Sequence, residues 1–388
     1  MKRVAYVCTD DGVPPFGRKG ASVHVQAMLT QLLDRGDEVH LLTPLPGTPA
    51  AHLARVAVHE LPRHAKGDNG VPTDGRVPEI LDALHAARPV DLVYERYSLW
   101  GRSGTAWARA HGVPCVLEVN APLPVEQARH RRLTHPEAAD AVARAATGQA
   151  DVVVCVSEPV AAWVRSLGTA GQAAVHVVPN GVDSRRFAPV PIRPHPAELT
   201  LGFVGTLKPW HGLGDLLRAL AVLRRTDPTY RLLVVGDGPQ REHLETVVAE
   251  LGLTGSVELT GAVDPQDVPA LLARMDVAVA PYPPLEDFYF SPLKVYEYLA
   301  AGLPVVASDV GPLPDLLTGG RERLGVVYPA GSPQDLAGAV AYLRHDPVAR
   351  ADLAARGRRA MVEEHDWKHV LERILGLTEA THVASHAS

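Results

Sequence analysis

The chain has 388 residues, of which 46% are hydrophobic, and its 44 acidic and 38 basic side chains give a formal net charge of −6. This length exceeds that of one ordinary hydrophobic core and predicts two domains, while the charge balance argues against nucleic acid as a partner. Three scattered cysteines predict neither a disulfide framework nor a zinc site, and no apolar run is long enough for a signal peptide or a transmembrane segment, so we expect a cytoplasmic protein.

The first half of the chain alternates apolar strands with amphipathic helical segments. In the segment 21–35, Val25, Met28, Leu29 and Leu32 recur at helical spacing. Most of the strand segments are continuous apolar runs, which is typical of parallel strands that are buried on both faces. We expect these strands at 3–8, 38–44, 55–61, 91–97, 114–120, 151–157 and 175–181.

The alternation stops at 183–198, where four prolines predict an extended linker, and then resumes. The later strands are expected at 199–205, 230–236, 256–261, 276–282, 304–309 and 324–329, with closing helices at 347–363 and 366–379. The sequence therefore predicts an α/β protein with two doubly wound, Rossmann-like domains that face a cleft, since ligands of such sheets bind outside the carboxyl ends of the strands. The expected parts are a first domain at 1–182, the linker at 183–198, a second domain at 199–364, and a helix and tail at 365–388 that could return to the first domain.

The stretch SPLKVYEYLAAG, residues 291–302, predicts a short helix whose amino end suits a phosphate. Ser291 is expected to cap this helix, Pro292 to start it and Gly302 to end it. Free amide groups at a helix amino end favour an anion, whereas a lysine in the first turn is unfavourable there. Lys294 therefore either meets an arriving anion or is a solvated surface side chain.

Glu297 lies on the apolar stripe of the same helix, where a carboxylate needs partners. A ribose diol would supply two hydroxyl donors. A neighbouring arginine would satisfy the carboxylate equally well, and the helix alone leaves both interpretations open.

Glycine-rich turns occur where three of the expected strands lead into helices. The first follows the strand at 199–205 and contains Gly205, Lys208, His211 and Gly212. The second is the Gly-Asp-Gly-Pro turn that begins at Gly236, and the third contains Gly17 and Gly20. Each pattern is weak by itself as a phosphate-binding signal, but three of them at the starts of helices favour an anionic ligand.

Taken together, these segments resemble the retaining glycosyltransferases of family 4, which have the GT-B fold. The matching pieces occur in the family's order along nearly the whole chain. They are KGASVHVQAM, PNGVDSRRFAP, VGTLKPWHG, VVGDGP, SVELTGAVDPQDVPALLARMDVAVAPY and SPLKVYEYLAAGLPVVASD.

The resemblance implies a nucleotide-sugar donor, held mainly by the second domain, and a small-molecule acceptor held by the first. It implies that a hexose is transferred with retention at the anomeric carbon, without a metal or another cofactor, because the nucleotide-sugar is a substrate. UDP is the base expected from its frequency in the family.

The resemblance also assigns roles to individual residues. Glu297 matches the glutamate that holds the ribose, and the main chain at Val263 matches the part that contacts the base. The diphosphate and the sugar are expected to meet three loops and one helix start, formed by Gly20, Ser22, Gly205, Thr206, His211, Gly236, Ser291, Pro292, Leu293 and Lys294.

The chain departs from the family pattern at four positions. Tyr289 replaces the first glutamate of the family's Glu-x7-Glu motif, although Glu286 and Asp287 lie close to it in the sequence. Thr206 and His211 replace a phosphate-binding arginine and lysine. Asn120 replaces a histidine near the reacting sugar.

These departures shape the expected mechanism, in which the leaving phosphate itself takes the proton of the acceptor. Lys208 and Lys294 would stabilise the departing charge. Asn120 and the nearby Glu118 are the other candidate catalytic residues, since an asparagine can hydrogen-bond but cannot act as a base.

The acceptor is expected to lie against the loops 9–19, 62–77, 95–104 and 121–135. Asp10, Asp11, Glu95 and Glu126 in these loops would suit a cationic acceptor such as an aminocyclitol. The same loops carry arginines, so they could also be ordinary loops of mixed charge. Two other functions stay open: a sugar-nucleotide epimerase, and a non-catalytic subunit that only binds the nucleotide-sugar.

Overall fold

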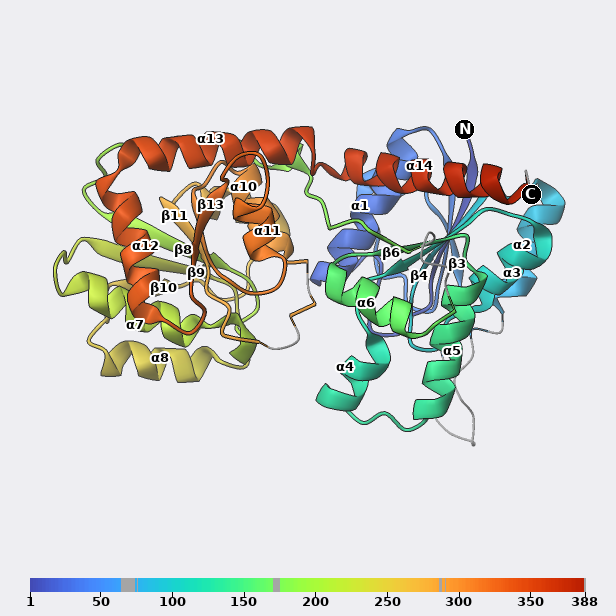
Figure 1. Ribbon diagram of the computed structural model, residues 1–388, viewed down its shortest axis with the longest axis horizontal. Helices are drawn as coiled ribbons and strands as arrows, with labels where there is room; N and C mark the ends of the chain where they lie inside the picture. The colour runs from blue at the N-terminus through green and yellow to red at the C-terminus, as the bar shows by residue number, and fades with distance from the viewer. Residues whose placement is uncertain (64–73, 75, 170–174, 286–287, 290, 387–388) are drawn as a thin grey trace. The chain divides into compact units, whose positions relative to one another are not determined.

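The computed structural model describes residues 1–63, 74, 76–169, 175–285, 288–289 and 291–386. It divides the chain into two compact units, which are labelled by their elements in Figure 1. Unit 1 contains Met1–Asn180, Tyr289–Ser291 and Trp367–Ser388, and unit 2 contains Gly181–Phe288 and Pro292–Asp366. The proline-rich stretch 183–198 thus belongs to unit 2, and the C-terminal helix belongs to unit 1.

Unit 1 is built on a parallel sheet with the strand order β3-β2-β1-β4-β5-β6-β7. The order reverses direction between β1 and β4, which places the loops after these two strands at the switch point where ligands of such sheets bind. The strands are β1 (Arg3–Cys8), β2 (Glu38–Thr43), β3 (Ala57–Glu60), β4 (Leu92–Arg96), β5 (Cys115–Val119), β6 (Val152–Cys155) and β7 (Val175–Val177).

Helices cover this sheet, and α14 packs against α1 although it comes from the far end of the chain (Figure 1). The helices are α1 (Gly20–Asp34), α2 (Val77–Ala87), α3 (Ser103–His111), α4 (Leu123–His130), α5 (Pro136–Gln149), α6 (Glu158–Ser166) and α14 (Trp367–His386), with a 3-10 turn at Ala51–Leu53. All four apolar residues predicted on the inner stripe of α1 are buried, which confirms the periodicity there.

Unit 2 has a second parallel sheet, with the order β10-β9-β8-β11-β12-β13 and a switch point between β8 and β11. Its strands are β8 (Leu199–Val204), β9 (Tyr230–Val235), β10 (Val257–Leu259), β11 (Val277–Ala280), β12 (Val305–Ser308) and β13 (Gly325–Tyr328). Its helices are α7 (Leu213–Arg224), α8 (Arg241–Glu250), α9 (Val268–Leu272), α10 (Leu293–Ala300), α11 (Leu313–Thr318), α12 (Pro333–His345) and α13 (Pro347–Glu363), with 3-10 turns at Ser184–Arg186, Pro209–His211 and Pro265–Asp267.

Every expected strand is present; β1 matches its expected range, and each of the others is one to four residues shorter than its apolar run. Strands that are buried on both faces form the cores, which is why their sequences are apolar throughout. The three cysteines are buried and unpaired. None of the helices in the described part of the chain combines the length and the apolarity that crossing a bilayer requires.

A fully buried arginine of α13 holds the proline-rich stretch 183–198 against unit 2. The guanidinium of Arg350 donates hydrogen bonds to the carbonyl oxygens of Leu343 at 2.8 Å, Arg193 at 2.5 Å and Pro194 at 2.8 Å. Arg193 in turn donates two hydrogen bonds to the buried carboxylate of Asp276, which also accepts one from the backbone of Thr200. The stretch is therefore fixed through its own backbone carbonyls.

Replacing Arg350 with Met should lower the free energy of unfolding of unit 2 by about 2–4 kcal/mol, because three carbonyl groups lose their buried donor. Arg356→Met, in the same helix, removes only a surface pair with Asp352 and should cost about 0.5 kcal/mol or less. Urea titrations followed by hydrogen exchange in unit 2 would measure both changes. Equal stability of the two variants would contradict this role of Arg350.

Candidate functional site

The candidate site of unit 2 lies at its switch point, where the loops after β8 and β11 begin. The loop after β8 runs from Gly205 into the 3-10 turn Pro209–His211, and the loop after β11 contains Tyr282 and leads toward α10. Backbone hydrogen bonds join the β8 loop to the turn after β9: Gly205 donates to Val235, and Leu207 donates to Asp237. These contacts fix the main chain of the site.

Two glycines in these loops are required by close backbone approach. Gly205 and Gly236 have φ angles of 146° and 138°, a region that only glycine adopts readily. A Cβ atom on Gly236 would lie 2.1 Å from the carbonyl oxygen of Gly205, and one on Gly205 would lie 2.9 Å from Nζ of Lys294. The glycines thus bring the loop backbone directly to the lysine.

The ammonium group of Lys294 is buried without a hydrogen-bond partner among the described residues. It lies 4.0 Å from the centre of the Phe203 ring and 5.4 Å from that of Tyr282. Burial lowers the pKa of Lys294 to about 7, although the nearby Glu297 opposes this change. A buried cation without a donor-acceptor partner is suited to receive an anion.

The start of α10 differs from the expectation. Helix α10 begins at Leu293, with Pro292 at the cap position, and no side chain caps it, so the prediction that Ser291 is the N-cap is wrong. The hydroxyl of Ser291 instead accepts a hydrogen bond from the Asn180 backbone, and Nδ2 of Asn180 donates to the Ser291 carbonyl. The first amide groups of α10 consequently keep no side-chain cap, so they stay available to a ligand.

Glu297 faces an arginine that the sequence did not identify. Its carboxylate lies 3.7 Å from the guanidinium of Arg186, and burial raises its pKa while Arg186 and Lys294 oppose this. The carboxylate makes no hydrogen bond within the described residues. Of the two interpretations left open by the sequence, the arginine partner is present, yet the oxygens can still accept hydrogen bonds from a diol.

His211 and its neighbours complete the loop after β8. Nδ1 of His211 donates a hydrogen bond of 2.5 Å to the carbonyl of Thr206. Burial, together with the nearby Lys294, lowers the pKa of His211 to about 3, so the ring is neutral. Thr206 is exposed, and Nζ of Lys208 lies 5.5 Å from the centre of the Trp210 ring.

The other residues expected to bind the nucleotide-sugar lie outside the loop after β8 and the start of α10. Val263 is half-buried in the loop after β10, within unit 2. Gly20 is exposed at the first position of α1, in unit 1. Ser22, in the same helix, is buried, and its hydroxyl makes no hydrogen bond to the described residues. Glu286 and Asp287 lie outside the residues that the structure describes, as does most of the loop 62–77.

In unit 1, Glu118 at the end of β5 is the centre of a buried polar network. Its carboxylate forms an ion pair with His24 of α1 and lies 3.7 Å from the guanidinium of Arg96. It accepts hydrogen bonds from the hydroxyl of Tyr94 at 2.8 Å and from Nδ2 of Asn120 at 2.9 Å. Burial by itself would raise the pKa of Glu118, but these partners, His24 foremost, lower it to about 2.

This network orients Asn120, which is only half-buried. Because Nδ2 donates to Glu118, the amide oxygen of Asn120 points elsewhere and can accept a hydrogen bond. Glu118 is ionised and fully engaged with side chains of the protein. Its observed role is therefore to orient the Asn120 side chain.

The four acidic candidates for acceptor binding lie in different surroundings. Asp10 accepts a hydrogen bond from the Gly12 backbone at 2.7 Å, and Asp11 is exposed beside it. Glu95 is fully buried, accepts from the Thr105 backbone at 2.6 Å, and has its pKa raised to about 8 by burial. Glu126 accepts a hydrogen bond of 2.9 Å from the hydroxyl of Tyr289, within unit 1.

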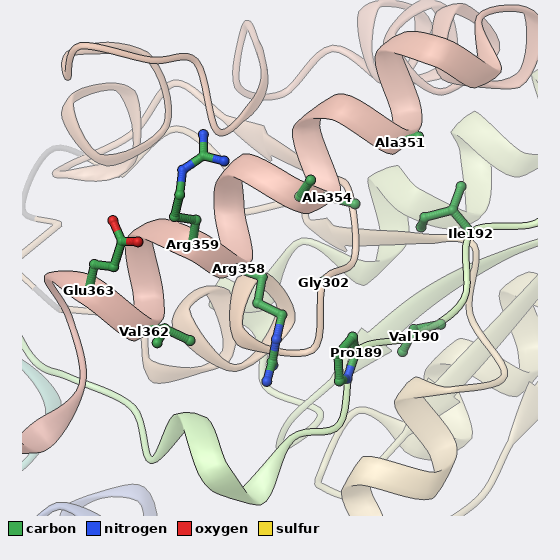
Figure 2. A pocket seen from close by; sticks show the side chains of 11 residues that line it. Pro189, Val190, Ile192, Gly302, Ala351, Ala354, Arg358, Arg359, Val362 and Glu363 are labelled. Atoms are coloured by element: carbon green, nitrogen blue, oxygen red, sulfur yellow. The ribbon is translucent and has the colours of Figure 1, made fainter.

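A separate groove lies along α13 of unit 2, away from these residues (Figure 2). It has a volume of about 430 Å³ and a mainly apolar wall, and none of the candidate site residues lines it. Among the side chains that surround it are Pro189, Ile192, Ala354, Arg358, Val362 and Glu363.

Comparison with known proteins identifies the family. Residues 18–186 match the model described as Glycosyltransferase Family 4, and residues 198–346 match Glycosyl transferases group 1. The 2-deoxystreptamine glucosyltransferase of Streptomyces kanamyceticus is 31% identical over 312 residues, which cover 74% of this chain and 79% of that protein. The chain belongs to glycosyltransferase family 4.

One further relative and one solved structure show how far the likeness extends. Glycogen synthase of Mycobacterium tuberculosis is 28% identical over 293 residues, a match that covers 72% of this chain and 66% of the synthase. HepE from Anabaena, solved in complex with UDP, superimposes with a TM-score of 0.71 at 17% identity and covers 97% of this chain and 100% of HepE. With its two Rossmann-like sheets, the glycosyltransferase has the GT-B fold.

Several residues of the site were missed at the sequence level. Arg186 lies beside Glu297, the rings of Phe203 and Tyr282 lie beside Lys294, and His24 and Arg96 lie beside Glu118. His24 gave one usable signal, because it lies four residues before Met28 and thus on the apolar stripe of α1. The others become neighbours only through packing between distant segments.

Lys294→Met should stabilise this glycosyltransferase when no ligand is bound, by about 2 kcal/mol at pH 6, since it removes a buried cation. The pKa of Lys294 falls from the ordinary value to about 7 on folding, so the unfolded chain binds the extra proton between pH 7 and about 10. Wild-type stability thus recovers as the pH rises through that window, and the difference shrinks. Urea unfolding at pH 6 and pH 9 measures it, and a pH-independent difference would contradict the burial argument.

Glu118→Gln should destabilise the protein by about 3 kcal/mol at pH 7, because Arg96 loses its buried counter-charge and His24 loses the carboxylate that it contacts. A carboxylate with a lowered pKa stabilises the fold above its ordinary pKa, and this contribution is lost as the pH falls toward 2. The variant and the wild type should therefore converge in acid. Glu79→Gln, which alters an exposed pair with Arg76, is the control and should change little.

Proposed function

We propose that this glycosyltransferase moves a hexose from a UDP-sugar to a hydroxyl group of a small polar acceptor, with retention at the anomeric carbon and without a metal ion. The observation that carries the proposal is the buried Nζ of Lys294, which has no hydrogen-bond partner in the described chain. It lies beside the glycine loop that begins at Gly205 and one residue into a helix whose amino end has no side-chain cap. A diphosphate would meet charge, amide groups and loop backbone together.

Two relatives support the choice of substrates. HepE was solved with UDP and also with UDP-glucose, the latter superimposing at a TM-score of 0.67. The Streptomyces relative is named for glucosyl transfer to 2-deoxystreptamine, which is an aminocyclitol. We therefore propose UDP-glucose as the first donor to test and an aminocyclitol as the first acceptor.

The residues of the chain support a transfer in which the donor supplies its own base. The bond between the anomeric carbon and the diphosphate oxygen breaks, the acceptor oxygen bonds to that carbon on the same face, and its proton passes to the departing phosphate. Lys294 and the first amides of α10 stabilise the negative charge that develops on the phosphate, and Lys208 adds positive charge nearby. Asn120, oriented by Glu118, accepts a hydrogen bond from a sugar or acceptor hydroxyl.

The test is calorimetry of UDP binding at pH 8 in buffers with different enthalpies of ionisation. Because burial holds the pKa of Lys294 near 7, the free lysine is mostly neutral at pH 8, and a bound diphosphate should protonate it. We expect uptake of up to about one proton per UDP by the wild type and none by Lys294→Met, with binding weakened about 10-fold or more.

Lys2→Met is the matched control, since Lys2 forms an exposed pair with Glu379 in unit 1. It should bind UDP as the wild type does, with the same proton uptake. UDP binding that is unchanged in Lys294→Met would overturn the donor-site proposal. Transfer is then assayed with UDP-glucose and 2-deoxystreptamine, and the anomeric configuration of the product is read by NMR.

A further inference from the structure

The side chain of His211 shares its surroundings with Lys294. Its ring centre lies 5.7 Å from that of Phe203 and 5.7 Å from that of Tyr282, the same two rings that lie under Nζ of Lys294. The 3-10 turn Pro209–His211 and the left-handed Gly212 hold it there, because a Cβ atom on Gly212 would lie 1.6 Å from the Pro281 carbonyl oxygen. The ammonium group of Lys294 and the imidazole of His211 thus lie beside the same two aromatic rings.

The hydrogen bond to Thr206 determines which nitrogen of His211 carries the proton. A backbone carbonyl can only accept, so Nδ1 must be the donor across the 2.5 Å contact. Nε2 therefore keeps its lone pair in the neutral ring, and it makes no hydrogen bond to the residues that the structure describes. Burial and the charge of Lys294 hold the pKa of His211 near 3, which keeps Nε2 an acceptor at physiological pH.

Lys294 and His211 would interact with different chemical groups of one ligand. Lys294 requires an anion, whereas Nε2 of His211 requires a hydrogen-bond donor. Phosphate oxygens accept hydrogen bonds and cannot satisfy Nε2, so the phosphates alone leave His211 without a partner. A hydroxyl group of a sugar attached to the phosphate can donate a hydrogen bond to Nε2. A glycosyl phosphate therefore offers an anion to Lys294 and a donor to His211.

We propose that His211 is a specificity-determining residue that accepts a hydrogen bond from a hydroxyl group of the transferred sugar. This inference rests on the proposed function, since it requires the diphosphate to lie at Lys294. At a position where the resemblance implies a phosphate-binding lysine, this chain thus binds the sugar instead. A donor sugar that lacks the hydroxyl leaves Nε2 unpaired and is discriminated against.

The test compares UDP with UDP-glucose in calorimetric binding to His211→Phe, which keeps an aromatic ring but has no acceptor. We expect UDP to bind within about 2-fold of the wild type, and UDP-glucose to lose about 10-fold. His211→Gln, whose amide oxygen can accept at a similar place, should recover part of the loss. His195→Phe, at an exposed position of unit 2, should leave both ligands unchanged.

A series of UDP-deoxyglucoses locates the hydroxyl group. One deoxy sugar should bind poorly to the wild type and no worse to His211→Phe, since the missing partner is the same in both cases. Equal weakening of UDP and UDP-glucose in His211→Phe, or no change in either, would overturn the proposal. If the wild type binds neither ligand, the proposed function and this inference fall together, whereas UDP binding with an indifferent His211 removes only the inference.

Discussion

The burial of one ammonium group organises the candidate donor site. Gly205 brings the β8 loop into contact with Nζ of Lys294, and the rings of Phe203 and Tyr282 lie beside it. An unpaired buried cation is unfavourable in the free protein, and the core of unit 2 must offset that cost. A bound anion would remove this cost by pairing with the ammonium group. We therefore place the proposed diphosphate at Lys294.

Much of this arrangement is predictable from the sequence, because it follows from local patterns. Parallel strands buried on both faces are apolar throughout, which is why all the strands were found. Gly205 and Gly236 mark the places where loop backbones touch, and glycine is the residue that such contact requires. The start of α10 shows the limit of local rules: Ser291 suits a cap by its type, yet its hydroxyl is already engaged with Asn180, far away in the chain.

The parts that sequence could not supply depend on pairs of distant residues. Glu118 was a candidate for catalysis because a carboxylate at the end of a strand often is one. Its role changes once His24, Arg96 and Tyr94 are seen around it, since these partners keep it ionised and buried. Arg186 is a similar case, because its approach to Glu297 requires the proline-rich stretch 183–198 to pack near α10. Neither pairing has a periodicity or a spacing that would reveal it.

At two of the positions that depart from the family pattern, the side chain is neutral and is oriented by a hydrogen bond that it donates. Asn120 stands where a histidine is expected and His211 where a lysine is expected, and both side chains are neutral here. Each is held in one orientation by a partner that can only accept, Glu118 for the asparagine and the Thr206 carbonyl for the histidine, so each presents an acceptor atom of its own. Under the proposed function, Lys294 would bind the phosphate, and His211 would discriminate between ligands by the direction of its hydrogen bond. That division suits a ligand whose phosphate supplies binding energy and whose hydroxyl groups supply its identity.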